Sequence, residues 1–107
     1  MNTIIEKTES KNIDGVSKIT LDTFQDFRGE IWTLYSKEYC DYEFVSDKIT
    51  ISRFGTLRGF HGDQHTAKLI SCLSGQFQLA VADTRIGSNT YGNVETYLIS
   101  DNEPAVV

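Results

Sequence analysis

The chain has 107 residues, of which 39% are hydrophobic, 11% aromatic and 23% charged, and its net charge of −5 comes from fifteen acidic and ten basic residues. This composition is typical of one soluble globular domain over residues 1–107 and argues against intrinsic disorder. The basic residues form no stripe, which argues against nucleic-acid binding, and no apolar run reaches the roughly twenty residues of a membrane span.

The N-terminal segment and the two cysteines indicate the cellular location and the redox state of the protein. The polar start MNTIIEKTESKN lacks the apolar core of a signal peptide, so the cytoplasm is the expected location. Cys40 and Cys72 are too few and too far apart for a zinc knuckle or a disulfide framework. We therefore expect two buried free thiols.

Short runs of β-branched and aromatic residues recur about every ten residues, separated by Gly, Asp, Asn and Ser, and they predict strands. In chain order the predicted strands are residues 16–20, 31–35, 44–54, 56–60, 67–73, 76–83 and 94–99. Alternation is clear in the third of these, where Ile49 and Ile51 share a face, and in the sixth, where Phe77, Leu79 and Val81 do.

Glycine-containing turns separate these strands. Ser74 and Gly75 fit a tight hairpin turn between two strands, and residues 86–93 fit a longer loop. Many short strands with such turns predict an all-β sandwich or barrel.

The segment GTLRGFHGDQHTAKLISCLSG, residues 55–75, has the spacing that marks metal-binding cupin barrels: Gly, five residues, His-x-His, three or four residues, Glu, six residues, Gly. His61 occupies the first ligand position, whereas Asp63 replaces the second histidine and Lys68 replaces the glutamate. An ammonium group at that point would repel a metal cation, so we expect no metal.

Three interpretations of this segment are open. A histidine beside a lysine suits proton abstraction next to a carbonyl, with His61 as base and Lys68 stabilising the enolate oxygen. In a plainer interpretation, His61 packs in a strand, Lys68 is solvated and nearby arginines form surface salt bridges. A degenerate metal site, with His65 as a substitute ligand, is the third.

Four separated segments carry a resemblance to a known family: FQDFRGEIW, FVSDKITISRFGTLRGFHGD, KLISCLSGQFQLAVADTR, and GSNTYGN followed by LISDN. In order and approximate spacing, over residues 21–102, they are similar to dTDP-4-dehydrorhamnose 3,5-epimerases. The resemblance implies an all-β RmlC-like cupin fold, also described as a jelly roll or double-stranded β-helix. LRGFHGD resembles the branch that acts on GDP-4-keto-6-deoxy-heptoses for bacterial surface polysaccharides.

The resemblance also implies roles for individual residues. His61 would remove the proton at C3 or C5 of a 4-keto nucleotide sugar, and Lys68 would polarise the C4 oxygen, without metal or organic cofactor. Arg58 and Arg28 would bind sugar or diphosphate, with Arg28 delivered by an N-terminal strand exchanged within a homodimer. Ser46, Asp47 and Lys48 stand where the family contacts the nucleotide, and of these only Asp47 matches the family pattern.

Two features depart from the family. Arg58 and His61 are three residues apart, which places them on opposite faces of a regular strand unless Gly59 introduces a bulge. Family members also continue well beyond the point that matches Val107, and their later half supplies a tyrosine acid and an aspartate that orients the histidine. The chain is thus expected to match the N-terminal portion of a barrel, and a non-catalytic nucleotide-sugar-binding module is the alternative to an epimerase.

Overall fold

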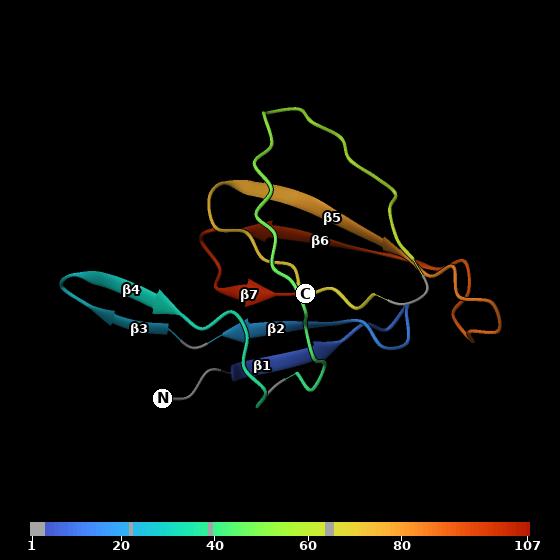
Figure 1. Ribbon diagram of the computed structural model, residues 1–107, viewed down its shortest axis with the longest axis horizontal. Coiled ribbons are helices and arrows are strands. Elements are labelled where there is room, and N and C mark those ends of the chain that lie inside the picture. Colours follow the sequence, from blue (N-terminus) through green and yellow to red (C-terminus); the bar gives the residue numbers. More distant parts are fainter. Residues whose placement is uncertain (1–3, 22, 39, 64–65) are drawn as a thin grey trace.

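The computed structural model describes residues 4–21, 23–38, 40–63 and 66–107, and every regular element within these ranges is a β-strand. The strands are β1 (Ile4–Glu9), β2 (Ser17–Leu21), β3 (Thr23–Asp26), β4 (Gly29–Trp32), β5 (Gln76–Ala82), β6 (Val94–Ser100) and β7 (Ala105–Val106). They form a sheet of order β1-β2-β7 and two hairpins, β3-β4 and β5-β6 (Figure 1). The predicted all-β fold class is confirmed.

The sheet that contains β2 holds the centre of the core. Antiparallel pairing joins β2 to β1 on one side and to β7 on the other. Ile19 and Leu21 are two residues apart on β2, so they share one face of the sheet, and both are buried. Half-buried side chains of Leu34, Cys40 and Leu69 pack against them. The core therefore gathers residues from β2 and from the long connection between β4 and β5.

The hairpin of β5 and β6 pairs in unbroken register from Gln76 with Ser100 to Ala82 with Val94. Figure 1 shows it above β1 and β2, with the connecting loop of residues 83–93 at its far end. Both strands and the loop between them were predicted from the sequence. Its apolar side chains are only partly covered, because Phe77 is 40% exposed and Leu98 65% exposed.

The hairpin of β3 and β4 extends away from the rest of the molecule (Figure 1). Its strands are joined by a two-residue turn, since Asp26 pairs with Gly29. A side-chain oxygen of Asp26 accepts a hydrogen bond from the backbone N–H of Arg28 at 2.8 Å, and Gly29 adopts a φ of +129° that favours glycine. The local sequence Asp-Phe-Arg-Gly thus specifies the turn.

Three predicted strands are wrong: residues 44–54, 56–60 and 67–73 form no strand in the part of the chain that the structure describes. A strand is stable only when a neighbour satisfies its backbone, and the first two segments have none here. Ile49 and Ile51, predicted to face the core, are 78% and 89% exposed. The third segment makes one bridge, in which Ile70 and Val107 exchange backbone hydrogen bonds of 2.8 and 2.9 Å.

Other details also differ from expectation. The strands β1, β3 and β7 were not predicted, and the turn at Ser74 and Gly75 precedes β5 without joining it to another strand. Cys40 and Cys72 are both free, but only Cys72 is buried, whereas Cys40 is half-buried. Among the described residues, no helix has the length and hydropathy needed to cross a bilayer.

Candidate functional site

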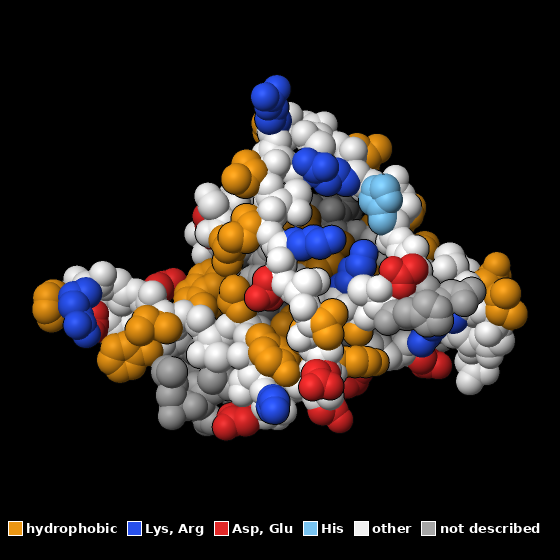
Figure 2. Space-filling model, viewed as in Figure 1, with side chains coloured by type: hydrophobic (Ala, Val, Ile, Leu, Met, Phe, Trp, Pro, Cys, Tyr) orange, Lys and Arg blue, Asp and Glu red, His pale blue; other side chains and the backbone are white. Residues whose placement is uncertain are grey.

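Six of the seven predicted site residues lie on the irregular connection between β4 and β5, and the seventh, Arg28, lies at the tip of the β3-β4 hairpin. All seven are exposed; those on the connection are Ser46, Asp47, Lys48, Arg58, His61 and Lys68. Figure 2 shows Lys and Arg side chains gathered over the part of the molecule that this connection occupies in Figure 1.

A tight turn organises the middle of the connection. The backbone N–H of Thr56 donates to the carbonyl of Arg53 at 3.1 Å, and the Arg58 Nε donates to the Ser52 hydroxyl at 3.0 Å. The second bond closes the base of a loop whose tip carries Phe54, which is fully exposed. Residues 52–58 therefore form a compact loop.

Gly59 separates this loop from His61 and has a φ of +126°. Residues with a Cβ rarely adopt this conformation, so glycine is favoured at this position. The sequence placed Arg58 and His61 on opposite faces of a regular strand, and the structure has no regular strand there. The alternation of side chains along a strand therefore does not apply to Arg58 and His61.

His61 and Lys68 are not bonded to each other in the described part of the chain. Both side chains are exposed, and no hydrogen bond or ion pair joins either of them to the other or to Arg28 in the described part of the chain. Asp63, between them, accepts a hydrogen bond from Thr66 at 2.7 Å. His65, the alternative metal ligand, lies outside the described residues.

Arg28 is held by its own hairpin. Its Nε donates to Asp26 at 3.1 Å, and its guanidinium carbon lies 5.8 Å from the centre of the Phe27 ring. Hydrogen bonds from the Arg28 side chain and backbone hold the pKa of Asp26 below its usual value. Arg28 is thus presented at an exposed tip, where its side chain is 72% accessible.

Sequence reasoning missed a buried carboxylate at the end of β5. The side chain of Asp83 is fully buried and paired with Arg85, whose Nε and Nη2 donate to it at 2.9 Å. The hydroxyls of Ser88 and Thr90 donate to the same carboxylate at 2.6 Å. The Arg85 guanidinium and then the two hydroxyls hold the pKa of Asp83 far below its usual range.

The group formed by Asp83, Arg85, Ser88 and Thr90, called the Asp83 cluster below, ties two distant parts of the chain together. Arg85 donates to the carbonyl of Asp14 at 2.7 Å, and Thr90 accepts from the backbone N–H of Asp14 at 3.1 Å. The cluster therefore fixes the β5-β6 loop against the β1-β2 turn. The letters DTRIGSNT are a recognisable signal, because Asp, Ser and Thr at these spacings favour local side-chain to backbone bonds.

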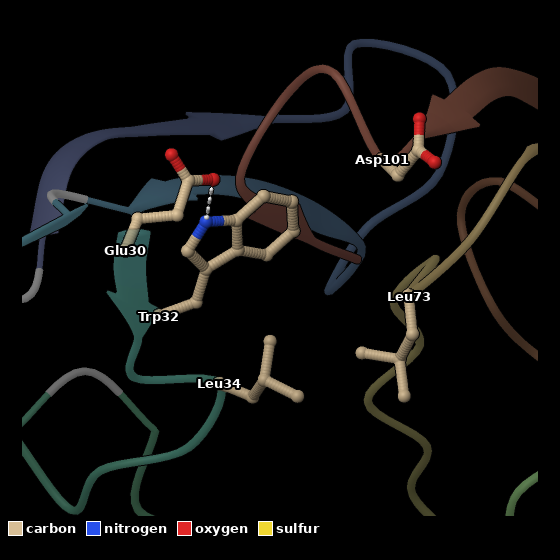
Figure 3. Close-up of a pocket in the computed structure, with 5 residues that line it drawn as sticks. All are labelled: Glu30, Trp32, Leu34, Leu73 and Asp101. Atoms are coloured by element: carbon tan, nitrogen blue, oxygen red, sulfur yellow. Dashed lines mark hydrogen bonds between the residues drawn. The ribbon is translucent and has the colours of Figure 1, made fainter. Parts of the chain in front are cut away.

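A hollow of about 340 Å³ lies beside β4, and its lining includes none of the predicted site residues. It is lined by Glu30, Trp32, Leu34, Leu73 and Asp101, and Figure 3 shows the Trp32 indole bonded to Glu30. That bond measures 2.7 Å. Two carboxylates beside apolar side chains do not suit a diphosphate, so the hollow and the predicted site are distinct. Within the described residues, no three His, Cys, Asp or Glu side chains are grouped to hold a metal.

The fold and the residues of the β4-β5 connection define an all-β protein of the cupin, or jelly-roll, class. The family model of dTDP-4-dehydrorhamnose 3,5-epimerase matches residues 10–107. A dTDP-4-dehydrorhamnose 3,5-epimerase from Streptomyces griseus is 37% identical over 87 residues, an alignment that covers 73% of this chain and 44% of the relative. The chain belongs to the dTDP-4-dehydrorhamnose 3,5-epimerase family, and it spans less than half the length of that curated relative.

Proposed function

We propose that the protein acts in the epimerisation of a nucleoside-diphosphate 4-keto-6-deoxy sugar at C3, C5 or both. The observation that supports this most strongly is the family match over residues 10–107, which includes Arg58, His61 and Lys68. The similarity to a relative named as a 3,5-epimerase supports the same reaction class.

The proposed chemistry needs only side chains and water. His61 takes the proton from the carbon next to the C4 ketone, and the electron pair of that C–H bond moves into an enolate with its negative charge on the C4 oxygen. Lys68 donates a hydrogen bond to this oxygen and neutralises the developing charge. A proton that originates from water then returns to the opposite face of the carbon, which inverts the centre.

Substrate binding is assigned to the remaining candidates. Arg58 and Arg28 bind the diphosphate or sugar, because a guanidinium matches phosphate oxygens with two parallel hydrogen bonds. Ser46, Asp47 and Lys48 contact the nucleotide. We place the reaction in the cytoplasm and, from the heptose-like LRGFHGD segment, in the synthesis of bacterial surface polysaccharide.

The exposure of His61 and Lys68 supports an assembled active site. A base and an enolate-stabilising cation work best when water is excluded, and neither residue is enclosed by this chain alone. We propose a homodimer in which each copy inserts its β3-β4 hairpin, with Arg28 at the tip, beside the partner's β4-β5 connection. Exposed Phe24, Phe27 and Ile31 on that hairpin favour this arrangement.

Solvent exchange tests the function directly. In D₂O, with dTDP- and GDP-linked 4-keto-6-deoxy sugars, the protein should introduce deuterium at C3 or C5, observed by NMR. His61→Ala should slow the exchange about 10²- to 10⁴-fold, and His65→Ala, the matched histidine control, should leave it nearly unchanged. Equal exchange by His61→Ala and the parent would remove His61 as the base.

A non-catalytic nucleotide-sugar-binding module is the second candidate function. The same exposure of His61 and Lys68 favours it, because this chain alone does not enclose the groups meant to act on one carbonyl. Saturable binding of the nucleotide sugar without any deuterium uptake, in protein shown to be folded and dimeric, would select this function over the epimerase.

A further inference from the structure

The basic side chains of the β4-β5 connection are not evenly distributed. Residues 48–62 contain Lys48, Arg53 and Arg58 and no acidic residue, although the whole chain carries a net charge of −5. On a protein that is acidic overall, a stretch that carries only positive charge is a place to which anions are attracted. Arg53 is the one of these three cations to which no role has been assigned.

Arg53 and Arg58 lie on the same loop of residues 52–58. The Ser52 hydroxyl accepts from the Arg58 side chain at 3.0 Å, and Arg53 follows Ser52 directly, with their Cα atoms about 3.8 Å apart. The turn bond from Thr56 to the Arg53 carbonyl fixes the backbone on the Arg53 side of the loop. Arg58 is thus held at the base of the loop, and Arg53 is the first residue of the turn next to its tip.

Both guanidinium groups are available to a ligand. Arg53 and Arg58 are exposed, and among the described residues Arg58 bonds only through its Nε, which leaves its two terminal nitrogens for another acceptor. No carboxylate of the described chain is hydrogen-bonded to either side chain. This differs from Arg85, which is already paired with the buried Asp83.

We propose that Arg53 is a further substrate-positioning residue. Together with Arg58, at the other end of the 52–58 loop, it binds the diphosphate of the nucleotide sugar. This inference rests on the proposed function for the identity of the ligand. A diphosphate presents several anionic oxygens within a short distance, so two guanidinium groups can each take a bidentate pair of hydrogen bonds. The Ser52 hydroxyl holds Arg58 in place for this.

Binding of inorganic pyrophosphate and of dTDP tests the proposal without requiring catalysis. With the full chain in low-salt buffer, titration calorimetry should show that Arg53→Ala weakens both ligands about tenfold, and that Arg53→Lys, which keeps the charge but not the fork, weakens them less. Lys37→Ala removes one exposed positive charge outside the loop and should change binding less than twofold.

Several outcomes would overturn the proposal. Parent protein that binds neither ligand at millimolar concentration, or Arg53→Ala and Lys37→Ala with equal effects, would show that Arg53 is an ordinary solvated charge. Thermal melting of each variant separates lost binding from lost folding. The proposed epimerase function fails separately: it is wrong if the parent binds dTDP-sugar but never exchanges deuterium, and that result leaves the role of Arg53 in binding intact.

Discussion

The polar residues discussed above differ in their exposure to solvent. Asp83 is buried and receives hydrogen bonds from Arg85, Ser88 and Thr90, whereas the proposed catalytic His61 and Lys68 are exposed. The polar groups of the Asp83 cluster satisfy one another, and its sequence has none of the spacings that mark a catalytic or metal site. The catalytic candidates were found from spacing and family resemblance, which reveal the identity of a residue but not the contacts it makes.

Replacement of Asp83 should lower stability and flatten its acid dependence. The folded pKa of Asp83 lies below the usual 3.8, so its ionised form stabilises the fold fully above about pH 5, and this contribution falls as the pH drops below 3.8. Asp83→Asn should lower Tm by about 5 to 10 °C at pH 7, and its Tm should fall less steeply than that of the parent between pH 5 and pH 2.

The control for this experiment is Asp101→Asn, which removes a carboxylate that is exposed and bonded to the Gly75 N–H. It should change Tm at pH 7 less than Asp83→Asn does. Identical Tm values for the parent and Asp83→Asn at neutral pH would show that the cluster does not hold the β5-β6 loop.

Loss of the Lys68 ammonium group should slow solvent exchange strongly. Lys68→Met keeps much of the side-chain length but cannot stabilise a negative oxygen, so deuterium uptake should fall about 10²- to 10³-fold. Lys11→Met removes an exposed lysine near the β1-β2 turn and should have no comparable effect. A Lys68→Met rate within twofold of the parent would place the oxygen-stabilising group elsewhere.

Several strands that pair with another strand of the same chain could be predicted from the sequence. The strand β2, the hairpin of β5 and β6 and its Asx-rich loop follow from alternation and turn chemistry. Residues 44–60 have the same alternation but no neighbouring strand, so their apolar side chains stay exposed. A sequence pattern shows that a segment can form a strand; it does not show whether a partner is present.

The β3-β4 hairpin is the element on which the proposed dimer depends. Phe27→Asp places a charge where a 97% exposed phenyl ring now stands, and it should convert dimer to monomer in light scattering at micromolar concentration. The matched control is Ile86→Asp, because Ile86 is 95% exposed on the β5-β6 loop, away from the hairpin. A parent that is monomeric, or a Phe27→Asp variant that remains dimeric, would exclude the hairpin as the interface.

The accessible surface area of the whole molecule is larger than expected for a compact monomer of its mass. Its accessible surface is 8741 Å², against about 6,000 Å² expected for a compact monomer of this size. Its radius of gyration of 14.8 Å likewise exceeds the roughly 13 Å of a typical domain of about 100 residues. Exposed apolar side chains contribute to that surface, as the hydrophobic groups in Figure 2 show. An excess near 2,700 Å² is well above the ~800 Å² that each partner buries in a standard interface.

Stability should therefore depend on protein concentration. If association covers this surface, a hundredfold increase in concentration should raise Tm by about 5 to 10 °C in differential scanning calorimetry. Phe27→Asp should abolish this dependence, and Ile86→Asp should retain it. A Tm that is constant across the range would mean that the chain is stable as a monomer despite its open surface.

The position of β2 between β1 and β7 has a consequence for synthesis. The residues of β7 follow β5 and β6 in the chain, yet they pair with β2, and the Leu21 N–H donates to the carbonyl of Pro104 at 2.7 Å. Because a ribosome adds residues in chain order, one edge of β2 remains unpaired until β7 has been made. The hairpin of β5 and β6, whose strands are closer in sequence, can therefore pair before the amino-terminal sheet is complete.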